Sequence, residues 1–376
     1  MLILSIETSC DETAAAVTKS ESAGFALLSN IVSSQVALHA EWGGVVPNLA
    51  AREHLKNILP VIQEALQKAN VKQKDIDLIA VTNGPGLIPA LLIGVSAAKT
   101  LSYLWGVPLI GIHHIEGHIY ANFIRKVKSH PPAGEAGKLK VKSEEVKLPL
   151  LCLVVSGGHT QLVLMKKHLD YEIIGETQDD AAGEAFDKVA RILELGYPGG
   201  PALSARAANY KQIKNTNYQI LDTVLPRPMI NSKDFNFSFS GLKTAVLYKF
   251  RALQKDLSPT EKELLVTELS FEFQQAACDV LIKKTIAAAQ KYAVKTIMLA
   301  GGVSANLELR NQLNEAIKKE LPNVSCVVPD LIYTGDNAAM IGTAAHFRYT
   351  LAKNKNIWDK NWKNLETNAN LKLTKS

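Results

Sequence analysis

Two histidines in one short stretch could do chemistry together. His114 and His118 are four residues apart in the sequence HHIEGH, directly after an apolar run at 107–112. Four residues make about one turn of a helix, so both imidazoles can point toward one metal ion. Solvated helix faces also carry histidines at this spacing. The stretch alone therefore leaves two interpretations open, a metal centre and an ordinary polar helix face.

The position of the acidic residue between the two histidines bears on whether the protein is a metalloprotease. Glu116 lies about 200° around the helix from His114, so we expect it to face away from a metal that the histidines hold. In H-E-x-x-H metalloproteases, the glutamate that serves as general base directly follows the first histidine. The offset in this chain differs, which argues against a metalloprotease.

Composition indicates an ordinary globular protein. The 376 residues are 47% hydrophobic and 21% charged, enough for two domains or one large duplicated domain. Four scattered cysteines form no C-x-x-C pair, which favours a reducing, cytoplasmic compartment. The start has no basic segment typical of a signal peptide, and the apolar runs are shorter than the roughly 20 residues that span a bilayer. We expect no membrane association, and the net charge of +6 permits an anionic partner such as nucleic acid.

The pattern of predicted elements occurs twice. In the first half we expect strands at 2–8, 14–18, 25–32, 78–82 and 109–112, and helices at 50–69, at 89–104 and from His114 onward. In the second half we expect strands at 150–155, 161–165, 171–175, 296–300 and 325–328, and helices at 184–195, 261–291, 305–318 and 337–350. Each half opens with strand, tight polar turn and strand. This repetition predicts an internal duplication in a mixed α/β fold.

Three segments interrupt this plan. Residues 125–147 combine prolines and glycines with seven Lys/Arg against three Glu, which predicts a solvated loop or, alternatively, a contact with RNA phosphates. A loop-rich insertion is expected at about 197–245, and the Lys/Asn-rich tail at 353–376 is expected to fray. The predicted organisation is therefore a lobe at 1–124, a basic loop at 125–147, a second lobe at 148–352 and the tail.

Two glycine-rich turns could bind an anion. Ser156, Gly157 and Gly158 follow a strand, and a backbone without side chains can approach phosphate oxygens closely. The sequence AGGVSAN at 300–306 follows another strand and opens a helix, where nucleotides commonly dock. Either stretch alone is equally compatible with a plain hairpin turn or a generic strand-to-helix turn.

Four acidic residues have simple structural interpretations when each is taken alone. Asp336 precedes a helix and could be its N-cap, and Asp187 could be a surface partner of Arg191 one turn later. Asp11 and Glu12 could be turn residues only. Their occurrence together with the histidines and the glycine turns favours a functional interpretation.

The ordered set of motifs resembles the TsaD family, the tRNA adenosine threonylcarbamoyltransferases formerly labelled glycoproteases. The matching stretches are IETSCDET at 6–13, NGPGL at 83–87, HHIEGH at 113–118, SGGHTQL at 156–162, DDAAGEAFDKVAR at 179–191, YPGGP at 197–201, FSFSGLKTA at 237–245, AGGVSAN at 300–306 and TGDNAAM at 334–340. They run in the family's order through most of the chain, and the ordered set is far more specific than any single motif.

The resemblance implies a fold and a set of ligands. The implied fold is a duplicated actin/sugar-kinase-like (ASKHA) α/β fold, with two lobes of mixed sheets around a nucleotide cleft. His114, His118 and Asp336 are implied to bind one divalent metal, Fe2+ or Zn2+, which is a sound ligand set for either ion. The residues implied to hold the nucleotide end of the substrate are Val154, Val155, Ser156, Gly157, Gly158, Asp187, Gly200 and Asn306. Some members carry an Asp where this chain has Ser204, so that contact is not carried over.

The resemblance also implies a reaction and its partners. The family moves a threonylcarbamoyl group from threonylcarbamoyl-AMP to the N6 amine of the adenosine 3′ of the anticodon, in tRNAs that read codons beginning with A. Asp11 or Glu12 is our prediction for a catalytic group that orients this amine or takes its proton. By resemblance to bacterial members, the expected partners are tRNA, a TsaB-like paralogue and a TsaE-like ATPase.

Two other functions fit the same fold. A non-catalytic, nucleotide-binding partner subunit is the main alternative, although such a paralogue is expected to lack the metal histidines that this chain keeps. A sugar kinase or ATPase is the other, and it would transfer a phosphoryl group to a small hydroxyl substrate.

Overall fold

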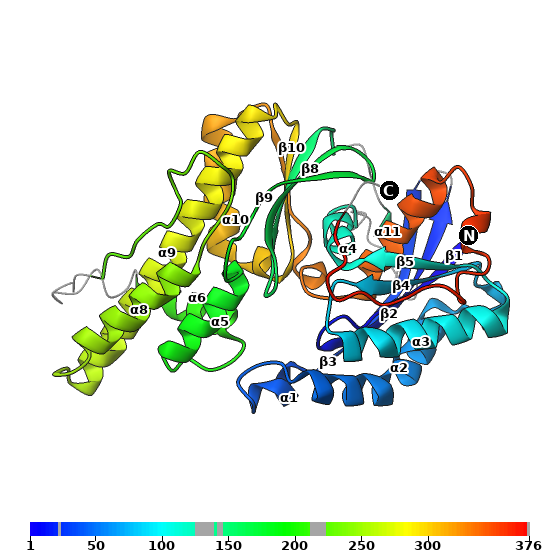
Figure 1. Cartoon of the computed structure of the whole chain (residues 1–376), viewed down its shortest axis with the longest axis horizontal. Coiled ribbons are helices and arrows are strands. Elements are labelled where there is room, and N and C mark those ends of the chain that lie inside the picture. The colour runs from blue at the N-terminus through cyan, green and yellow to red at the C-terminus, as the bar shows by residue number, and fades with distance from the viewer. Residues whose placement is uncertain (22–23, 125–138, 141–145, 211–222, 374–376) are drawn as a thin grey trace, which may run out of the picture. The chain divides into compact units, whose positions relative to one another are not determined.

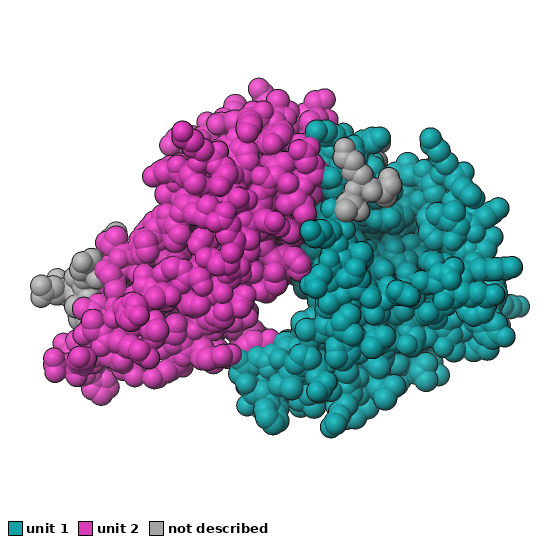
Figure 2. All heavy atoms as spheres, in the orientation of Figure 1, with its two compact units in different colours: residues 1–147, 165–171, 327–376 teal, residues 148–164, 172–326 magenta. Residues whose placement is uncertain are grey.

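The structure is a computed structural model, and it describes residues 1–21, 24–124, 139–140, 146–210 and 223–373. Most of the predicted basic loop at 125–147 therefore lies outside the described residues, as do residues 374–376. Two compact units are distinguished in Figure 2. Unit 1 comprises Met1–Lys147, Met165–Tyr171 and Val327–Ser376, and unit 2 comprises Leu148–Leu164 and Glu172–Cys326.

The two sheets repeat one strand order. The first sheet has the order β5-β4-β1-β2-β3-β6, and the second has the order β11-β10-β7-β8-β9. In each sheet three consecutive strands are neighbours, and two later strands are added beyond the first of them. The parallel pairing of β1 with β4 recurs as the parallel pairing of β7 with β10. The predicted internal duplication in a mixed α/β fold is confirmed.

The first sheet and its helices lie in unit 1 (Figure 1). The strands are β1 Leu2–Glu7, β2 Glu12–Glu21, β3 Gly24–Ser34, β4 Leu78–Gly84, β5 Leu109–His113 and β6 Leu139–Lys140. The α-helices are α1 Val36–Ala40, α2 Pro47–Ala69, α3 Ile88–Trp105, α4 His114–Ala121 and α11 Ala338–Leu351. Short 3-10 helices are η1 Gln73–Asp75, η4 Leu331–Tyr333 and η5 Asn356–Trp358.

Side chains of β1 alternate between the two faces of this sheet, as the pleat requires. Leu4 and Ile6 are fully buried in an apolar core that also contains residues of α2 and α3. Ser5 points to the other face, where its hydroxyl donates to the carbonyl of Ala338 at 2.7 Å. A Cβ at Gly342 would lie 3.0 Å from the Ser5 hydroxyl, so glycine lets α11 approach the sheet closely. This close contact fixes the start of α11, where Asp336 lies.

One helix of unit 1 is apolar along its length. Helix α3 is long and apolar enough to cross a membrane, judged by length and composition alone, and it is the single such helix among the described residues. It packs against α2 and β4, and its buried residues, including Leu91, Val95 and Ala98, include spacings of three and four. A helix that covers a sheet passes the same test, so α3 by itself is weak evidence for a span.

The second sheet and its helices lie mostly in unit 2 (Figure 1). The strands are β7 Leu150–Val155, β8 Thr160–Lys167, β9 Asp170–Glu176, β10 Thr296–Ala300 and β11 Ser325–Val327. The helices are α5 Ala182–Ile192, α6 Gly199–Ala208, α8 Ser240–Leu253, α9 Pro259–Lys291 and α10 Leu307–Glu320, with the 3-10 turn η3 Gly302–Ala305. Helix α9 begins with a capping box between Ser258 and Glu261. It runs for 33 residues and places residues such as Leu269 and Phe273 in the unit 2 core.

The structure corrects three expectations from the sequence. The region 197–245 is less loop-rich than expected, because it contains α6 and the first turns of α8. The tail does not fray over 353–373: the Asn361 amide donates to the carbonyl of Leu109 at 2.9 Å, and the Asn368 N–H donates to that of Asn83 at 2.8 Å. Contacts also group residues from Val327 onward with unit 1, whereas the sequence placed 148–352 in one lobe.

Candidate active site

The two histidines of unit 1 are placed by a direct strand-to-helix transition. Helix α4 begins at His114, immediately after β5 ends at His113. His113 is the N-cap, and its Nδ1 accepts the Ile115 N–H at 3.1 Å. Its Nε2 lies 2.9 Å from the carbonyl of Leu371 and donates to it when Nδ1 is the acceptor. Both ring nitrogens of His113 are thus used to hold the start of the helix that carries His114 and His118.

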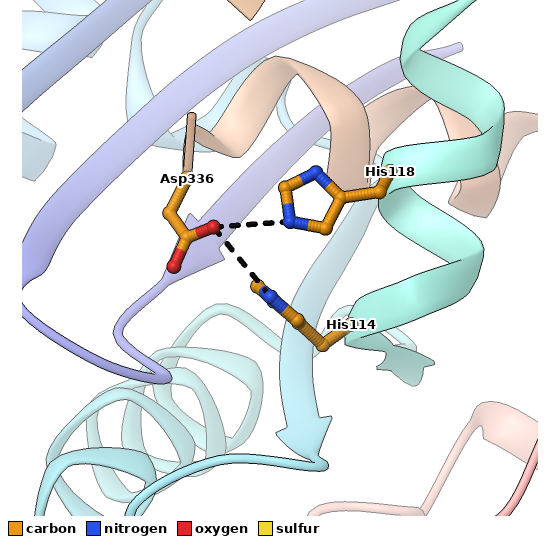
Figure 3. Close-up of side chains that lie close together, drawn as sticks. All are labelled: His114, His118 and Asp336. Atoms are coloured by element: carbon orange, nitrogen blue, oxygen red, sulfur yellow. Dashed lines mark ion pairs between the residues drawn. The ribbon is translucent and has the colours of Figure 1, made fainter. Parts of the chain in front are cut away.

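Asp336 faces these histidines from the segment before α11 (Figure 3). Its Oδ1 lies 3.5 Å from His114 Nε2 and 3.1 Å from His118 Nε2. The N-cap of α11 is Asn337, whose side chain accepts the Met340 N–H at 3.0 Å. The simple interpretation of Asp336 as an N-cap is therefore wrong. Ligand atoms of the three residues lie within 4.8 Å of one another, so this group could hold a metal ion.

A buried glutamate lies beside the Nδ1 atom of His114, whereas Asp336 lies near the Nε2 atom. Glu7 is fully buried at the end of β1, and its Oε2 lies 3.3 Å from His114 Nδ1. The Ser9 hydroxyl lies 3.1 Å from the same nitrogen. A carboxylate on the far nitrogen of a ligating histidine fixes the ring and its tautomer, leaving the other nitrogen for a metal. Sequence reasoning missed Glu7, although an acid at the end of an apolar strand was a usable signal.

The charges around His114 favour a positive species at this point. Burial by itself would lower the pKa of the His114 imidazole, but the carboxylates of Asp336 and Glu7 outweigh burial and raise the pKa to about 9. The same two carboxylates attract a metal cation, so a metal and a proton compete for His114.

Helix α4 packs closely against α11 on the side away from the metal group. A Cβ at Gly117 would lie 2.8 Å from Ile341 Cδ1, so glycine permits this approach. Glu116 is fully buried and accepts two hydrogen bonds from the Arg348 guanidinium, at 2.5 and 2.8 Å. The prediction that Glu116 faces away from a metal held by the histidines is confirmed. Both carboxylate oxygens of Glu116 accept hydrogen bonds from Arg348, which argues against a general base at this position.

Glu12 lies close enough to Asp336 for that charge to affect its pKa, and Asp11 is its neighbour in the sequence. Burial, followed by the charges of Asp336 and Asp11, raises the pKa of Glu12 well above its ordinary value. Burial and the charges of Asp11 and Asp336 likewise raise the pKa of the Cys10 thiol. The Ser34 hydroxyl donates to Glu12 at 3.0 Å. Glu12, one of the two predicted catalytic carboxylates, therefore lies near Asp336 of the metal group, and the catalytic role of either residue stays a prediction.

In unit 2, the turn after β7 presents open backbone. Val154 and Val155 end the buried strand, Ser156 follows, and Gly157 and Gly158 are exposed with open space where a side chain would be. Two other glycines lie in close contact with the turn. A Cβ at Gly183 would lie 2.5 Å from the Ser156 carbonyl oxygen, and a Cβ at Gly301 would lie 2.5 Å from the Val155 carbonyl oxygen. This geometry suits an anion-binding turn, and sequence reasoning missed the supporting Gly183.

The remaining predicted nucleotide residues are joined by hydrogen bonds. Asp187 of α5 accepts the N–H groups of Gly199 and Gly200, at 2.9 and 3.3 Å, at the start of α6. Asn306 is the N-cap of α10 and accepts the Leu309 N–H at 2.9 Å. Its amide donates to the Ser204 hydroxyl of α6 at 3.0 Å and to Gln274 of α9 at 2.9 Å. Gly200 lies in α6, and the side chains of Asp187 and Asn306 both form hydrogen bonds with that helix.

The role of Gly301 can be measured with its neighbour as a control. Gly301 has a φ of +85°, whereas Gly302 has nothing within 4 Å of an added Cβ. We expect Gly301→Ala to destabilise unit 2 by about 2 kcal/mol or more, because it adds backbone strain to a backbone clash. Gly302→Ala should change stability by less than about 1 kcal/mol. Denaturant unfolding of both variants checks this, and equal effects would contradict the close-approach account.

Comparison with known proteins identifies the family. The model of a family described as TsaD: tRNA N6-adenosine threonylcarbamoyltransferase matches residues 26–343. The chain belongs to this family. A tRNA N6-adenosine threonylcarbamoyltransferase from Listeria welshimeri is 48% identical over 94% of this chain and 92% of its own length. One from Persephonella marina is 48% identical, over 93% of this chain and 90% of its own length. The resemblance of the ordered motifs is thereby confirmed, and the chain is a transferase of a tRNA-modifying family.

Solved structures agree on the fold. HypF in a phosphate- and nucleotide-bound form aligns with a TM-score of 0.54 at 12% identity, over 94% of this chain and 47% of that chain. HypF from T. kodakarensis aligns with a TM-score of 0.52 at 12% identity, over 93% of this chain and 48% of that chain. At this identity the likeness concerns the fold alone. Together with the repeated strand order, it confirms the predicted duplicated actin/sugar-kinase-like class.

Proposed function

We propose that this TsaD-family chain transfers a threonylcarbamoyl group from threonylcarbamoyl-AMP to the N6 amine of the adenosine 3′ of the anticodon, in tRNAs that read codons beginning with A. The observation that carries this proposal is the His114, His118 and Asp336 group, in a chain 48% identical to a tRNA N6-adenosine threonylcarbamoyltransferase. A non-catalytic partner subunit would have no need for this donor set, so the group favours the enzyme.

The donor set suits one divalent metal. Two imidazole nitrogens and one carboxylate leave coordination positions open for substrate, and this combination fits Zn2+ or Fe2+. The Glu7 carboxylate behind His114 completes the pattern found around metal-ligating histidines. A metal bound there would supply Lewis-acid activation of the carbamoyl carbonyl, which a weakly nucleophilic adenine amine needs.

The glycine turn of unit 2 supports the proposed nucleotide site. Backbone N–H groups in a turn without side chains can hold the phosphate of threonylcarbamoyl-AMP. The proposed contacts with the nucleotide end are those of Val154, Val155, Ser156, Gly157, Gly158, Asp187, Gly200 and Asn306. The Asn306 amide already donates to Ser204 and Gln274, so a ligand contact there would exchange one of these bonds.

We assign proton handling at the amine to Asp11 or Glu12. Glu12 lies near Asp336, and Asp11 is adjacent to Glu12 in the sequence. A carboxylate beside the amine can orient it or take its proton as the N–C bond forms. Replacing the responsible residue by Ala should lower transfer about 100-fold or more with bound metal retained. Transfer unchanged in both the Asp11→Ala and the Glu12→Ala variant would remove the assignment.

The proposed partners follow from the reaction and from the family. The target base lies in a single-stranded loop, so presenting it costs little unstacking energy. We also propose that the chain works with a TsaB-like paralogue and a TsaE-like ATPase in the cytoplasm. The scattered free cysteines are compatible with that compartment.

Metal removal separates the proposed enzyme from the alternative subunit. The protein is stripped with a chelator and assayed with threonylcarbamoyl-AMP, tRNA and the candidate partners, before and after addition of Fe2+ or Zn2+. The proposal expects transfer to disappear with the metal and to return with one of the two ions. A metal-loaded protein that binds adenine nucleotide but transfers nothing to any tRNA would favour the non-catalytic subunit.

A further inference from the structure

The C-terminal segment of unit 1 concentrates positive charge. Residues 351–376 contain six lysines and two acids, a net +4 in a chain whose total is +6. Four of these lysines, Lys353, Lys355, Lys360 and Lys363, are exposed and lie within one short stretch. We call these four side chains the lysine surface.

The backbone under the lysine surface is folded. Residues 355–365 form successive turns, in which the Trp358 N–H donates to the Lys355 carbonyl and the Leu365 N–H to that of Asn361. Two aromatic contacts hold this stretch to helices: Trp358 stacks on Tyr349 with centroids 5.6 Å apart, and Trp362 lies 4.7 Å from Tyr103. Lys355, Lys360 and Lys363 therefore extend from a folded scaffold, which lowers the entropy cost of binding a partner.

The lysine surface differs from lysines elsewhere in the chain that have acidic partners. Other lysines of the chain have acidic partners, such as Lys188 with Asp180 at 3.0 Å and Lys262 with Glu194 at 3.1 Å. Within the part of the chain that the structure describes, none of the four lysines forms an ion pair. Lys355 and Lys363 instead lie over the rings of Tyr349 and Trp362, at 4.6 and 5.2 Å from the centroids. Four ammonium groups without an ion pair among the described residues, three of them on this folded stretch, suit a polyanion.

The same segment leads from the lysine surface to the metal group. Asn361 bonds to Leu109 at the start of β5, and Leu371 bonds to His113 at its end, next to His114. These anchor points are separated by the length of β5, roughly 13 Å at the usual strand rise. Segment and metal group belong to unit 1, so their spacing is set within one compact body (Figure 1). Charges on one nucleic acid strand follow one another every few ångströms, so phosphates a few nucleotides from a base at His114 span a distance of the order that separates these two anchor points.

We propose that the lysine surface docks the phosphate backbone of the substrate tRNA beside the modified loop. The inference rests on the proposed function, since it assigns tRNA as the occupant. Charge complementarity favours a nucleic acid backbone, and lysines without base-reading partners suit phosphates rather than a particular sequence. Docking here supplies affinity and orientation, whereas the loop base is recognised at the metal group.

A pair of charge-matched variants tests this docking surface. The first replaces Lys353, Lys355, Lys360 and Lys363 by Gln. The control replaces Lys74, Lys255, Lys318 and Lys319, which are equally exposed elsewhere on the chain, so both variants lose the same net charge. Purified tRNA is titrated against each full-length protein at several salt concentrations.

The first variant should bind tRNA at least 10-fold more weakly at about 0.1 M salt. The plot of log binding constant against log salt concentration should be flatter by up to about 3, because each lost phosphate contact removes roughly 0.7–0.9 from its slope. Its KM for tRNA should rise while the KM for threonylcarbamoyl-AMP stays the same. The control should bind like the wild type.

Equal weakening in both variants, or no weakening in the first, would overturn the proposal. The proposal would also be overturned if the first variant no longer bound an acidic protein partner but still bound tRNA like the wild type. If the wild-type protein modifies tRNA, these outcomes test the lysine surface alone. If the wild-type protein modifies no tRNA, the proposed function itself fails.

Discussion

Asp336→Asn is expected to lower metal affinity at least 100-fold and threonylcarbamoyl transfer about 1000-fold. The Asp336 carboxylate is the one acidic ligand of the candidate group, and its Oδ1 lies close to both histidines. An amide of the same shape keeps the packing but loses the negative charge that attracts a divalent cation. Loss of several kcal/mol of electrostatic stabilisation corresponds to about three orders of magnitude in rate.

A neighbouring residue provides the matched control for this variant. Asp330 is exposed and lies six residues earlier, outside the His114, His118 and Asp336 group. Asp330→Asn should therefore leave both metal content and transfer rate near the wild-type values. Metal content measured by elemental analysis, together with the transfer rate, checks both variants. Full metal occupancy and full activity in Asp336→Asn would refute the ligand assignment.

Arg348→Met is expected to destabilise the metal-free protein by about 3 kcal/mol and to weaken metal binding as well. Glu116 is fully buried, and its two hydrogen bonds with the Arg348 guanidinium join α4 to α11. Removing the arginine leaves a buried carboxylate without its compensating charge, which typically costs 3–5 kcal/mol, and the partial exposure of Arg348 places the effect at the lower end. The two helices carry or adjoin all three candidate ligands, so a shift between them disturbs the metal group.

A second substitution separates charge from packing in this pair. The double variant with Glu116→Gln and Arg348→Met removes the stranded charge, and we expect it to regain most of the lost stability. Urea unfolding of wild type, single and double variants gives the free energies. A single variant as stable as the wild type would show that the ion pair does not hold α4 against α11.

The parts of the site that the sequence revealed are those with a local signal. The four-residue spacing of His114 and His118 follows from the helical period, and the Ser156-Gly157-Gly158 turn follows from its composition. Asp336 was ambiguous, because an acid before a helix is usually an N-cap, and the adjacent Asn337 takes that role instead. The family resemblance, rather than spacing, joined Asp336 to the histidines.

The parts that were missed depend on contacts between distant segments. Glu7 orients His114 across 107 residues of sequence. Its position at the end of an apolar strand is a signal for the acid, but no local pattern identifies His114 as its partner. Helix α6 begins with two glycines that the Asp187 side chain caps from α5, so its own sequence lacks the usual start signal. The tail has the composition of a fraying end. Buried Leu365 and Leu373 nevertheless fix it in place, together with a backbone hydrogen bond to β4 and a hydrogen bond from the Asn361 side chain to β5.

The most direct test of the central claim is threonylcarbamoyl transfer from threonylcarbamoyl-AMP to purified tRNA, measured for the wild type and for His114→Ala with the candidate partners present. The account predicts N6-threonylcarbamoyladenosine in the tRNA with the wild type, and loss of both product and bound metal in the variant. Product formation by a His114→Ala protein that holds no metal would contradict the metal-assisted mechanism. No product from a metal-loaded wild type with its partners would contradict the transferase assignment itself.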